Sequence, residues 1–182
     1  MAAVCVFCGS STTVDQRYLL LAREVGGALA TAGYTVVSGG GRVGMMGALA
    51  AGARFAGGRT IGIIPKVLYG AEVADTDSDE LVVTADMAER KTEMVARSDA
   101  FLALPGGIGT MDELFEVWTT TFLGVHAKPV LLLSPDGFYQ HLLSFVDALV
   151  ADHFLTEQAR ARLQVVTSVP AAIQTLTTAL PP

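Results

Sequence analysis

Short apolar runs alternate with longer amphipathic segments along almost the whole chain. The apolar runs predict strands over 3–7, 35–37, 59–64, 81–84, 100–104, 129–133 and 163–166. Apolar residues at helical spacing predict helices over 15–32, 45–55, 86–98, 110–122, 138–150 and 170–180. The segment 66–79 is acidic and rich in turn formers, so we expect a connection without regular structure there.

Strands that alternate with helices favour a parallel sheet, because parallel neighbours need crossover connections. We therefore predict a single domain over 1–182: a Rossmann-like, doubly wound α/β fold with six or seven strands and helices on both faces. Ligands of such folds bind beyond the carboxyl ends of the strands. Ser10, the loop 39–44 and the loop 106–110 each follow a predicted strand, so they should meet at one cleft.

The composition narrows the class of protein further. With 182 residues, 51% of them hydrophobic, the chain is long enough to bury the core of one domain. The formal charge of -6 argues against nucleic-acid and membrane-surface partners, which would require a basic face. No apolar run is long enough for a membrane span and the start lacks a cationic region, so a cytoplasmic protein is expected. Apolar residues around 119–122 and 138–150 favour a homodimer or a larger homo-oligomer.

The turn between the run 100–104 and the next helix carries the strongest chemical signal. Three glycines in four positions allow close approach of a ligand, and the amides of Gly107, Gly109 and Thr110 can bind an anion such as phosphate. Glu113 has two interpretations. It completes a capping box with Thr110 as N-cap, or it is a functional carboxylate.

Arg90 is the second candidate, and it also allows two interpretations. It shares a helical face with Met87, Met94 and Arg97. Its guanidinium either extends along the surface or points inward to a carboxylate or phosphate.

Two other patterns give weaker signals. Gly39-x-Gly41-x-x-Gly44 satisfies the dinucleotide fingerprint, but no acidic residue ends the following strand, so a mononucleotide held between two glycine loops fits better. Cys5 and Cys8 would face opposite sides of a strand, which favours buried free thiols. The three histidines are scattered without metal-ligand spacing, so no metal site is predicted.

Four segments carry a family resemblance. The run Pro-Gly-Gly-Ile-Gly-Thr-Met-Asp-Glu at 105–113 resembles the P-G-G-x-G-T-x-x-E signature of the LONELY GUY-type cytokinin riboside 5′-monophosphate phosphoribohydrolases, which have also been labelled lysine decarboxylases. The segments 5–11, 39–47 and 87–91 extend the resemblance over most of the chain up to Phe122.

This resemblance implies an enzyme of cytokinin biosynthesis that needs no cofactor. It would split the N-glycosidic bond of cytokinin or adenosine 5′-monophosphates to a free base and ribose 5-phosphate, with Arg90 and Glu113 as the catalytic pair. The residues expected to bind the substrate or its phosphate are Ser10, Gly41, Gly44, Met87, Lys91, Gly107, Gly109 and Thr110.

The sequence departs from the family pattern at two positions. Ala88 replaces the histidine of M-H-x-R-K, which would alter either the base preference or the turnover, and Asp112 replaces the first of two glutamates. One alternative is a non-catalytic nucleotide-binding or carrier module of the same fold. Another is decarboxylation with pyridoxal phosphate, which would need a Schiff-base lysine at Lys66, Lys91 or Lys128.

Overall fold

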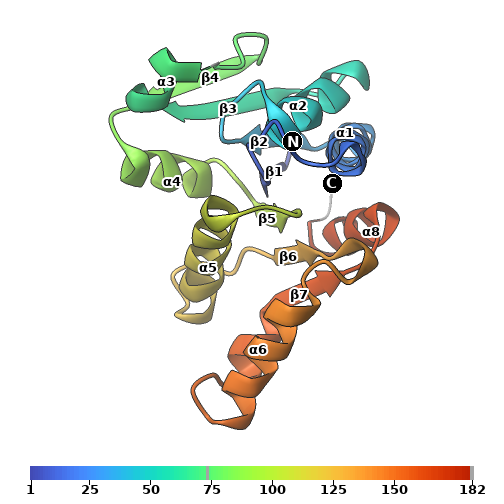
Figure 1. Ribbon diagram of the computed structural model, residues 1–182, viewed down its shortest axis with the longest axis vertical. Coiled ribbons are helices and arrows are strands. Elements are labelled where there is room, and N and C mark those ends of the chain that lie inside the picture. Colours follow the sequence, from blue (N-terminus) through green and yellow to red (C-terminus); the bar gives the residue numbers. More distant parts are fainter. Residues whose placement is uncertain (73, 181–182) are drawn as a thin grey trace.

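A parallel sheet with the strand order β4-β3-β2-β1-β5-β6-β7 runs through the centre of the protein (Figure 1). The computed structural model describes residues 1–72 and 74–180. Within them the strands are β1 (Ala3–Phe7), β2 (Thr35–Ser38), β3 (Thr60–Pro65), β4 (Glu80–Thr84), β5 (Ala100–Ala103), β6 (Val130–Leu133) and β7 (Leu163–Val166). Every pairing between neighbouring strands is parallel. The predicted doubly wound α/β fold is therefore confirmed.

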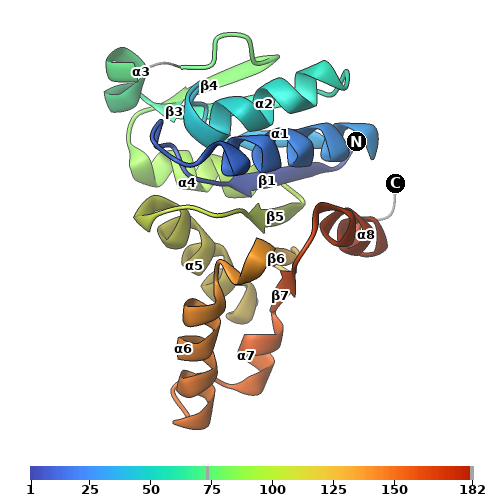
Figure 2. The ribbon, with the colours of Figure 1, turned by 45° about the vertical axis from the view of Figure 1, so that its right-hand side comes forward.

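The helices connect these strands and cover both faces of the sheet (Figures 1 and 2). They are α1 (Gln16–Thr31), α2 (Gly44–Phe55), α3 (Lys66–Glu72), α4 (Met87–Ala96), α5 (Ile108–Phe122), α6 (Gln140–Ala151), α7 (Glu157–Ala161) and α8 (Val169–Ala179), with a 3₁₀ turn η1 (Pro135–Gly137) before α6. In the part of the chain covered by 1–72 and 74–180, no helix is long and apolar enough to cross a membrane.

Strand β1 divides the core into two layers, because its successive side chains point to opposite faces. Val4 and Val6 pack with α1, α2 and α8, whereas Phe7 packs with α4, α5 and α6. Cys5 and Cys8 lie in different layers, and both are buried free thiols. The sequence prediction for these two cysteines is thus confirmed.

The strand order changes direction at β1. The chain adds β2, β3 and β4 on one side of β1, and then β5, β6 and β7 on the other side. The helices that leave β1 and β5 therefore diverge and open a crevice above the carboxyl ends of these two strands. The loop that starts at Gly9 and the glycine turn that starts at Pro105 border this crevice, and the Gly9 N–H donates to the Pro105 carbonyl at 3.3 Å.

Helices α1 and α2 touch backbone to backbone. A Cβ on Gly26 would lie 2.0 Å from the Leu49 carbonyl oxygen, and a Cβ on Gly52 would lie 2.0 Å from that of Arg23. Only glycine permits this distance, because a real Cβ would overlap the facing carbonyl. The Met45 N–H also donates to the Gly9 carbonyl, so the loops at the start of these helices are joined.

Two parts of the chain differ from the sequence prediction. Residues 66–72 form α3, so the prediction of a connection was wrong there; no breaker follows Pro65 until Gly70. The acidic part that follows is a loop held by polar contacts. Asp75 forms an ion pair with Arg54, and the Asp79 carboxylate accepts a hydrogen bond from the Thr60 N–H. Val73, also part of the predicted connection, lies outside the described residues. Helix α7 was not predicted, since it spans only five residues.

Candidate active site

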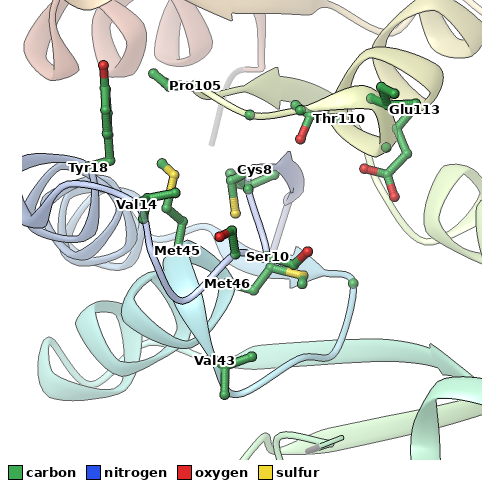
Figure 3. Close-up of a pocket in the computed structure, with 18 of the residues that line it drawn as sticks. Cys8, Ser10, Val14, Tyr18, Val43, Met45, Met46, Pro105, Thr110 and Glu113 are labelled. Atoms are coloured by element: carbon green, nitrogen blue, oxygen red, sulfur yellow. The ribbon is translucent and has the colours of Figure 1, made fainter. Parts of the chain in front are cut away.

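A cavity of about 600 Å³ lies at the carboxyl edge of the sheet, where the segments after β1, β2, β3 and β5 meet (Figure 3). This volume falls in the range of small-molecule sites. One end of the cavity is formed by Arg90 and Glu113, and the other by Tyr18 and Phe138. The remaining lining residues are Val6, Cys8, Gly9, Ser10, Ser11, Val14, Gly39, Val43, Met45, Met46, Ile64, Leu68, Met87, Pro105, Gly106, Gly107, Ile108, Gly109 and Thr110.

The glycine turn forms the middle of the cavity wall. Helix α5 begins at Ile108 with Gly107 as its N-cap, and no side chain caps its free N–H groups. A Cβ on Gly107 or Gly109 would meet no protein atom within 4 Å, so the space above them is left for a ligand. The positive end of the α5 dipole and these free amides favour an anion at this place.

The capping box, one of the two interpretations of Glu113, is absent. Thr110 is buried in the first turn of α5 rather than at its N-cap, and Glu113 does not reach back to the helix start. The reason lies in Gly106, where a Cβ would come within 2.1 Å of the Thr110 hydroxyl oxygen. The turn therefore lies closely over Thr110, and the helix starts two residues earlier than predicted. Glu113 is bonded elsewhere.

Arg90 and Glu113 form an ion pair between α4 and α5 at the wall of the cavity. The Arg90 Nη1 donates to Glu113 Oε1 at 3.0 Å, and the two side chains are only 8% and 10% exposed. Two backbone carbonyls hold the same guanidinium, since Nε donates to Ile63 O at 3.1 Å and Nη2 to Gly39 O at 3.4 Å. The structure thus shows the inward alternative for Arg90.

Gly39 is necessary for this arrangement. A Cβ at Gly39 would lie 1.9 Å from Arg90 Nη2, so any other residue would displace the guanidinium. The loop after Gly39 is held in turn by the Asp75 N–H, which donates to the Gly40 carbonyl at 2.8 Å, and by an isolated bridge between Gly41 and Ala74. The glycines of the 39–44 pattern therefore help to position the Arg90 guanidinium as well as to shape the cavity.

Burial raises the pKa of Glu113 above its ordinary value of 4.5, and the Arg90 guanidinium opposes part of that rise. Asp112 raises the pKa of Glu113 further, and Lys91 lowers it. Glu113 is thus a carboxyl group with a single close cation, at the wall of a cavity. Groups of this kind are common at catalytic sites.

Some of the other predicted site residues line the cavity, and others do not. Ser10, Met87, Gly107, Gly109 and Thr110 line the cavity as expected. Gly41 and Gly44 do not line it. At Gly44 the backbone φ is +59°, and a Cβ would come within 2.7 Å of the Ser10 carbonyl, so Gly44 supports Ser10 from behind.

Lys91 is not brought into the cavity. Its ammonium group lies 3.1 Å from the Asp112 carboxylate and also pairs with Glu116, on the outer side of α5. Arg90 lines the cavity, whereas these two carboxylates hold the neighbouring Lys91 side chain away from it. The expected substrate contact of Lys91 is not supported by this position.

Sequence reasoning missed one whole end of the cavity. Tyr18 of α1 and Phe138, just before α6, meet there with ring centroids 5.6 Å apart. Cys8 and Met45 line the same cavity (Figure 3). Phe138 follows β6, so the rule that ligands collect beyond strand ends could have indicated it. Nothing in the pattern around Tyr18 distinguishes it from an ordinary core residue.

Comparison with known proteins agrees with this site. Residues 46–176 match the protein-family model described as "Possible lysine decarboxylase". A protein of Mycobacterium tuberculosis named cytokinin riboside 5′-monophosphate phosphoribohydrolase is 47% identical over 171 residues, which cover 94% of this chain and 91% of that protein. The chain belongs to this family. A probable cytokinin riboside 5′-monophosphate phosphoribohydrolase of Oryza sativa is 48% identical over 157 residues, 86% of this chain and 69% of that protein.

A solved structure shares the fold. The molybdenum cofactor carrier protein of Chlamydomonas reinhardtii aligns over 98% of both chains with a TM-score of 0.75 and 25% identity. The family resemblance of the sequence motifs is therefore confirmed, and so is the predicted fold.

The lysines of the chain do not suit the chemistry of the family description "Possible lysine decarboxylase". Lys66 is exposed at the start of α3, Lys91 is held by carboxylates, and the Lys128 ammonium donates to the Val95 carbonyl at 2.7 Å. None of them lines the cavity. A Schiff-base lysine, which pyridoxal phosphate chemistry needs, is therefore missing from this site.

Replacing Arg90 with methionine should leave Glu113 without its cation and raise its pKa further. A carboxyl whose pKa is higher in the folded state binds more protons when folded. Stability then falls as the pH rises from the ordinary glutamate pKa through the folded one. We expect Arg90→Met to lose about 3 kcal/mol of unfolding free energy near pH 7 and to recover part of it near pH 5.

Urea unfolding at the two pH values measures this effect. Arg97→Met is the control, because Arg97 pairs with Glu80 and Glu93 at the surface and should lose less than about 1 kcal/mol. A loss in Arg90→Met that is equal at both pH values would contradict the assigned role of the pair.

Proposed function

We propose that this protein hydrolyses the N-glycosidic bond of nucleoside 5′-monophosphates and releases a free base and ribose 5-phosphate. The observation that carries the proposal is the buried pair of Arg90 and Glu113 at the wall of a nucleotide-sized cavity, a few residues from an uncapped helix start. Family membership supports the same chemistry, since the relatives are named for this activity.

The glycine turn would bind the 5′-phosphate. No side chain caps the start of α5, residues 107–110 there line the cavity, and Ser10 and Thr110 add hydroxyl groups to the same lining. Glu113 lies one turn further along α5 than Thr110. A phosphate at the helix start therefore places the attached ribose near the carboxylate of Glu113, and the binding energy of the phosphate fixes the position of the reacting bond.

Glu113 would act on the anomeric carbon. As the bond to the base breaks, positive charge develops on the ribose ring, and a carboxylate close to it stabilises that charge. The same carboxylate can accept a proton from the attacking water, whose oxygen becomes the new anomeric hydroxyl. The departing base takes up one proton, so that water is divided between the two products.

Arg90 would keep Glu113 ionised and oriented. Its guanidinium donates to the carboxylate and to two carbonyls at once, so it has little freedom to turn elsewhere. Since burial alone raises the pKa of Glu113, a fixed cation is needed to retain the carboxylate at neutral pH.

The base would lie against apolar side chains near this pair. Ile64, Leu68 and Met87 line the cavity there, and they come from β3, α3 and α4. An apolar wall suits adenine and also an adenine that bears an isopentenyl group, as the names of the relatives suggest. Ala88, which replaces the family histidine, is exposed next to Met87 and does not line the cavity.

The alternative is a carrier that holds a nucleotide without turnover. It has support from the solved carrier protein of similar fold. The two proposals differ in product release, because only a hydrolase liberates the base.

Incubation with AMP and with isopentenyl-AMP tests the function. We expect free base and ribose 5-phosphate from both nucleotides, and at least a hundredfold lower kcat/KM with adenosine, about 3 kcal/mol of lost phosphate contribution. Chromatography of the bases measures the rates. Binding of AMP without base release would favour the carrier, and equal rates on AMP and adenosine would show that the glycine turn holds something else.

Glu113→Gln separates catalysis from folding. Glutamine keeps the size of the side chain and can still accept from Arg90, but it cannot stabilise positive charge, so turnover of AMP should fall by about a hundredfold or more. Affinity for AMP should persist, since the glycine turn is unchanged.

Asp112→Asn is the matched control. Asp112 precedes Glu113 on the same helix, but its side chain is 56% exposed and pairs with Lys91. The control should retain turnover within about threefold of the parent, because loss of an exposed pair costs little. If both variants keep the parental rate, Glu113 is not the catalytic carboxylate.

We further propose a homodimer or larger homo-oligomer. Helix α5 and the turn after it expose Phe115, Phe122, Leu123 and Val125, more apolar surface than a monomer usually presents in one stretch.

Light scattering at micromolar concentration should give at least twice the mass of one chain. Replacing Leu123 by lysine should shift the protein toward monomer. A monomeric parent would refute this assembly.

We also propose a cytoplasmic location. Both cysteines of the chain are free thiols in the core, a state that is typical of proteins from reducing compartments.

A further inference from the structure

Tyr139 makes a buried hydrogen bond to the glycine turn from a distant part of the chain. Its side chain is 4% exposed, and its hydroxyl donates to the Leu104 carbonyl at 2.7 Å. Leu104 is the last residue before the Pro105-Gly106 turn, whereas Tyr139 is the N-cap residue of α6. Tyr139 does not line the cavity, so it has no direct contact with a ligand there.

The turn is fixed from two sides. On the β1 side, the Leu104 N–H donates to the Phe7 carbonyl at 2.9 Å, and the Gly9 N–H donates to the Pro105 carbonyl. On the β6 side, the Tyr139 hydroxyl donates a hydrogen bond to the Leu104 carbonyl. This bond ties the residue before Pro105 to the start of α6. Burial also raises the pKa of the Tyr139 hydroxyl.

Tyr139 is itself held firmly. Its backbone N–H donates to the buried Ser134 hydroxyl at 3.0 Å, and its ring meets that of Phe138 edge to face, with centroids 4.7 Å apart. A side chain fixed in this way can impose a position on its partner, since little of its own freedom remains to be lost.

Small movements of the turn would reach the anion site directly. Gly106 lies closely over Thr110, and the free amides of α5 begin two residues later. We propose that Tyr139 is a positioning residue, which sets the geometry of the phosphate-binding turn through Leu104. This inference rests on the proposed function in one respect only, namely that the turn binds the 5′-phosphate.

The test compares Tyr139→Phe with Tyr34→Phe. Tyr34 is also buried, at 6% exposure, and its hydroxyl donates to a backbone carbonyl, that of Leu180. It precedes β2 and thus lies at the opposite edge of the sheet from the cavity. Both variants lose a hydrogen bond from a buried tyrosine, at 2.7 Å for Tyr139 and 3.5 Å for Tyr34, so both should melt at a lower temperature than the parent. Only one of them should affect the turn.

Calorimetric binding of ribose 5-phosphate and of adenosine gives the decisive readout. Tyr139→Phe should weaken the affinity for ribose 5-phosphate by about tenfold, the equivalent of one well-made hydrogen bond. Its affinity for adenosine should equal that of the parent. Tyr34→Phe should bind both like the parent. An unchanged affinity of Tyr139→Phe for ribose 5-phosphate, or an equal loss for both probes, would overturn the proposal.

Ser134→Ala provides a second, milder variant if Tyr139→Phe does not fold. It removes only the acceptor of the Tyr139 N–H, so we expect about a threefold loss for ribose 5-phosphate and none for adenosine. No change for either probe would overturn the proposal as well. Because binding is measured without turnover, a parent that binds ribose 5-phosphate but releases no base from AMP would refute the hydrolase alone.

Discussion

A buried charge must be matched on every side, and this requirement fixes the arrangement around Arg90. Removing a guanidinium and a carboxylate from water costs several kcal/mol for each ion unless good partners replace the water. Here Glu113, Ile63 and Gly39 supply these partners. Among the residues the structure describes, no buried side-chain nitrogen or oxygen lacks a hydrogen-bond partner. The ion pair exists only because α4, α5, β2 and β3 meet at one place.

The strand order brings those elements together. Strand β1 lies between β2 and β5, so the loops after all three strands share one edge of the sheet. The helix that starts after β5 directs its dipole toward the cavity, and the helix after β4 carries a cation to the same wall. In a chain with a net charge of -6, local concentration of positive potential is what allows an anionic ligand to bind.

The sequence predicted those features that depend on neighbouring residues. Apolar runs and helical spacing located the sheet and most helices, and the turn at 105–110 was found from its glycines. The sequence pattern could not decide whether the Arg90 side chain points inward or along the surface, because both alternatives use the same helical face. The answer depends on carbonyls of Ile63 and Gly39, which are distant along the chain.

Other features that the sequence did not reveal have the same origin. The start of α5 depends on how closely Gly106 approaches Thr110, and sequence spacing alone suggested a later N-cap. The position of Lys91 depends on Asp112 and Glu116 across the helix interface. Phe138 lines the cavity beside Tyr18, and no local pattern contains this pairing because the two residues are distant along the chain.

The close packing of α1 against α2 at Gly26 and Gly52 has a consequence for how the cavity accepts different bases. It locks α1 to α2, and with them the loops that carry Ser10 and Met45, so this wall is stiff. On the opposite wall, α3 is short, and its residues Val67 and Leu68 are exposed to solvent. In the proposed function the base lies against α3, and the phosphate lies against the glycine turn. The residues that would limit the size of the base are therefore not those that would carry out the chemistry, and substrate range could change without disturbing the catalytic pair.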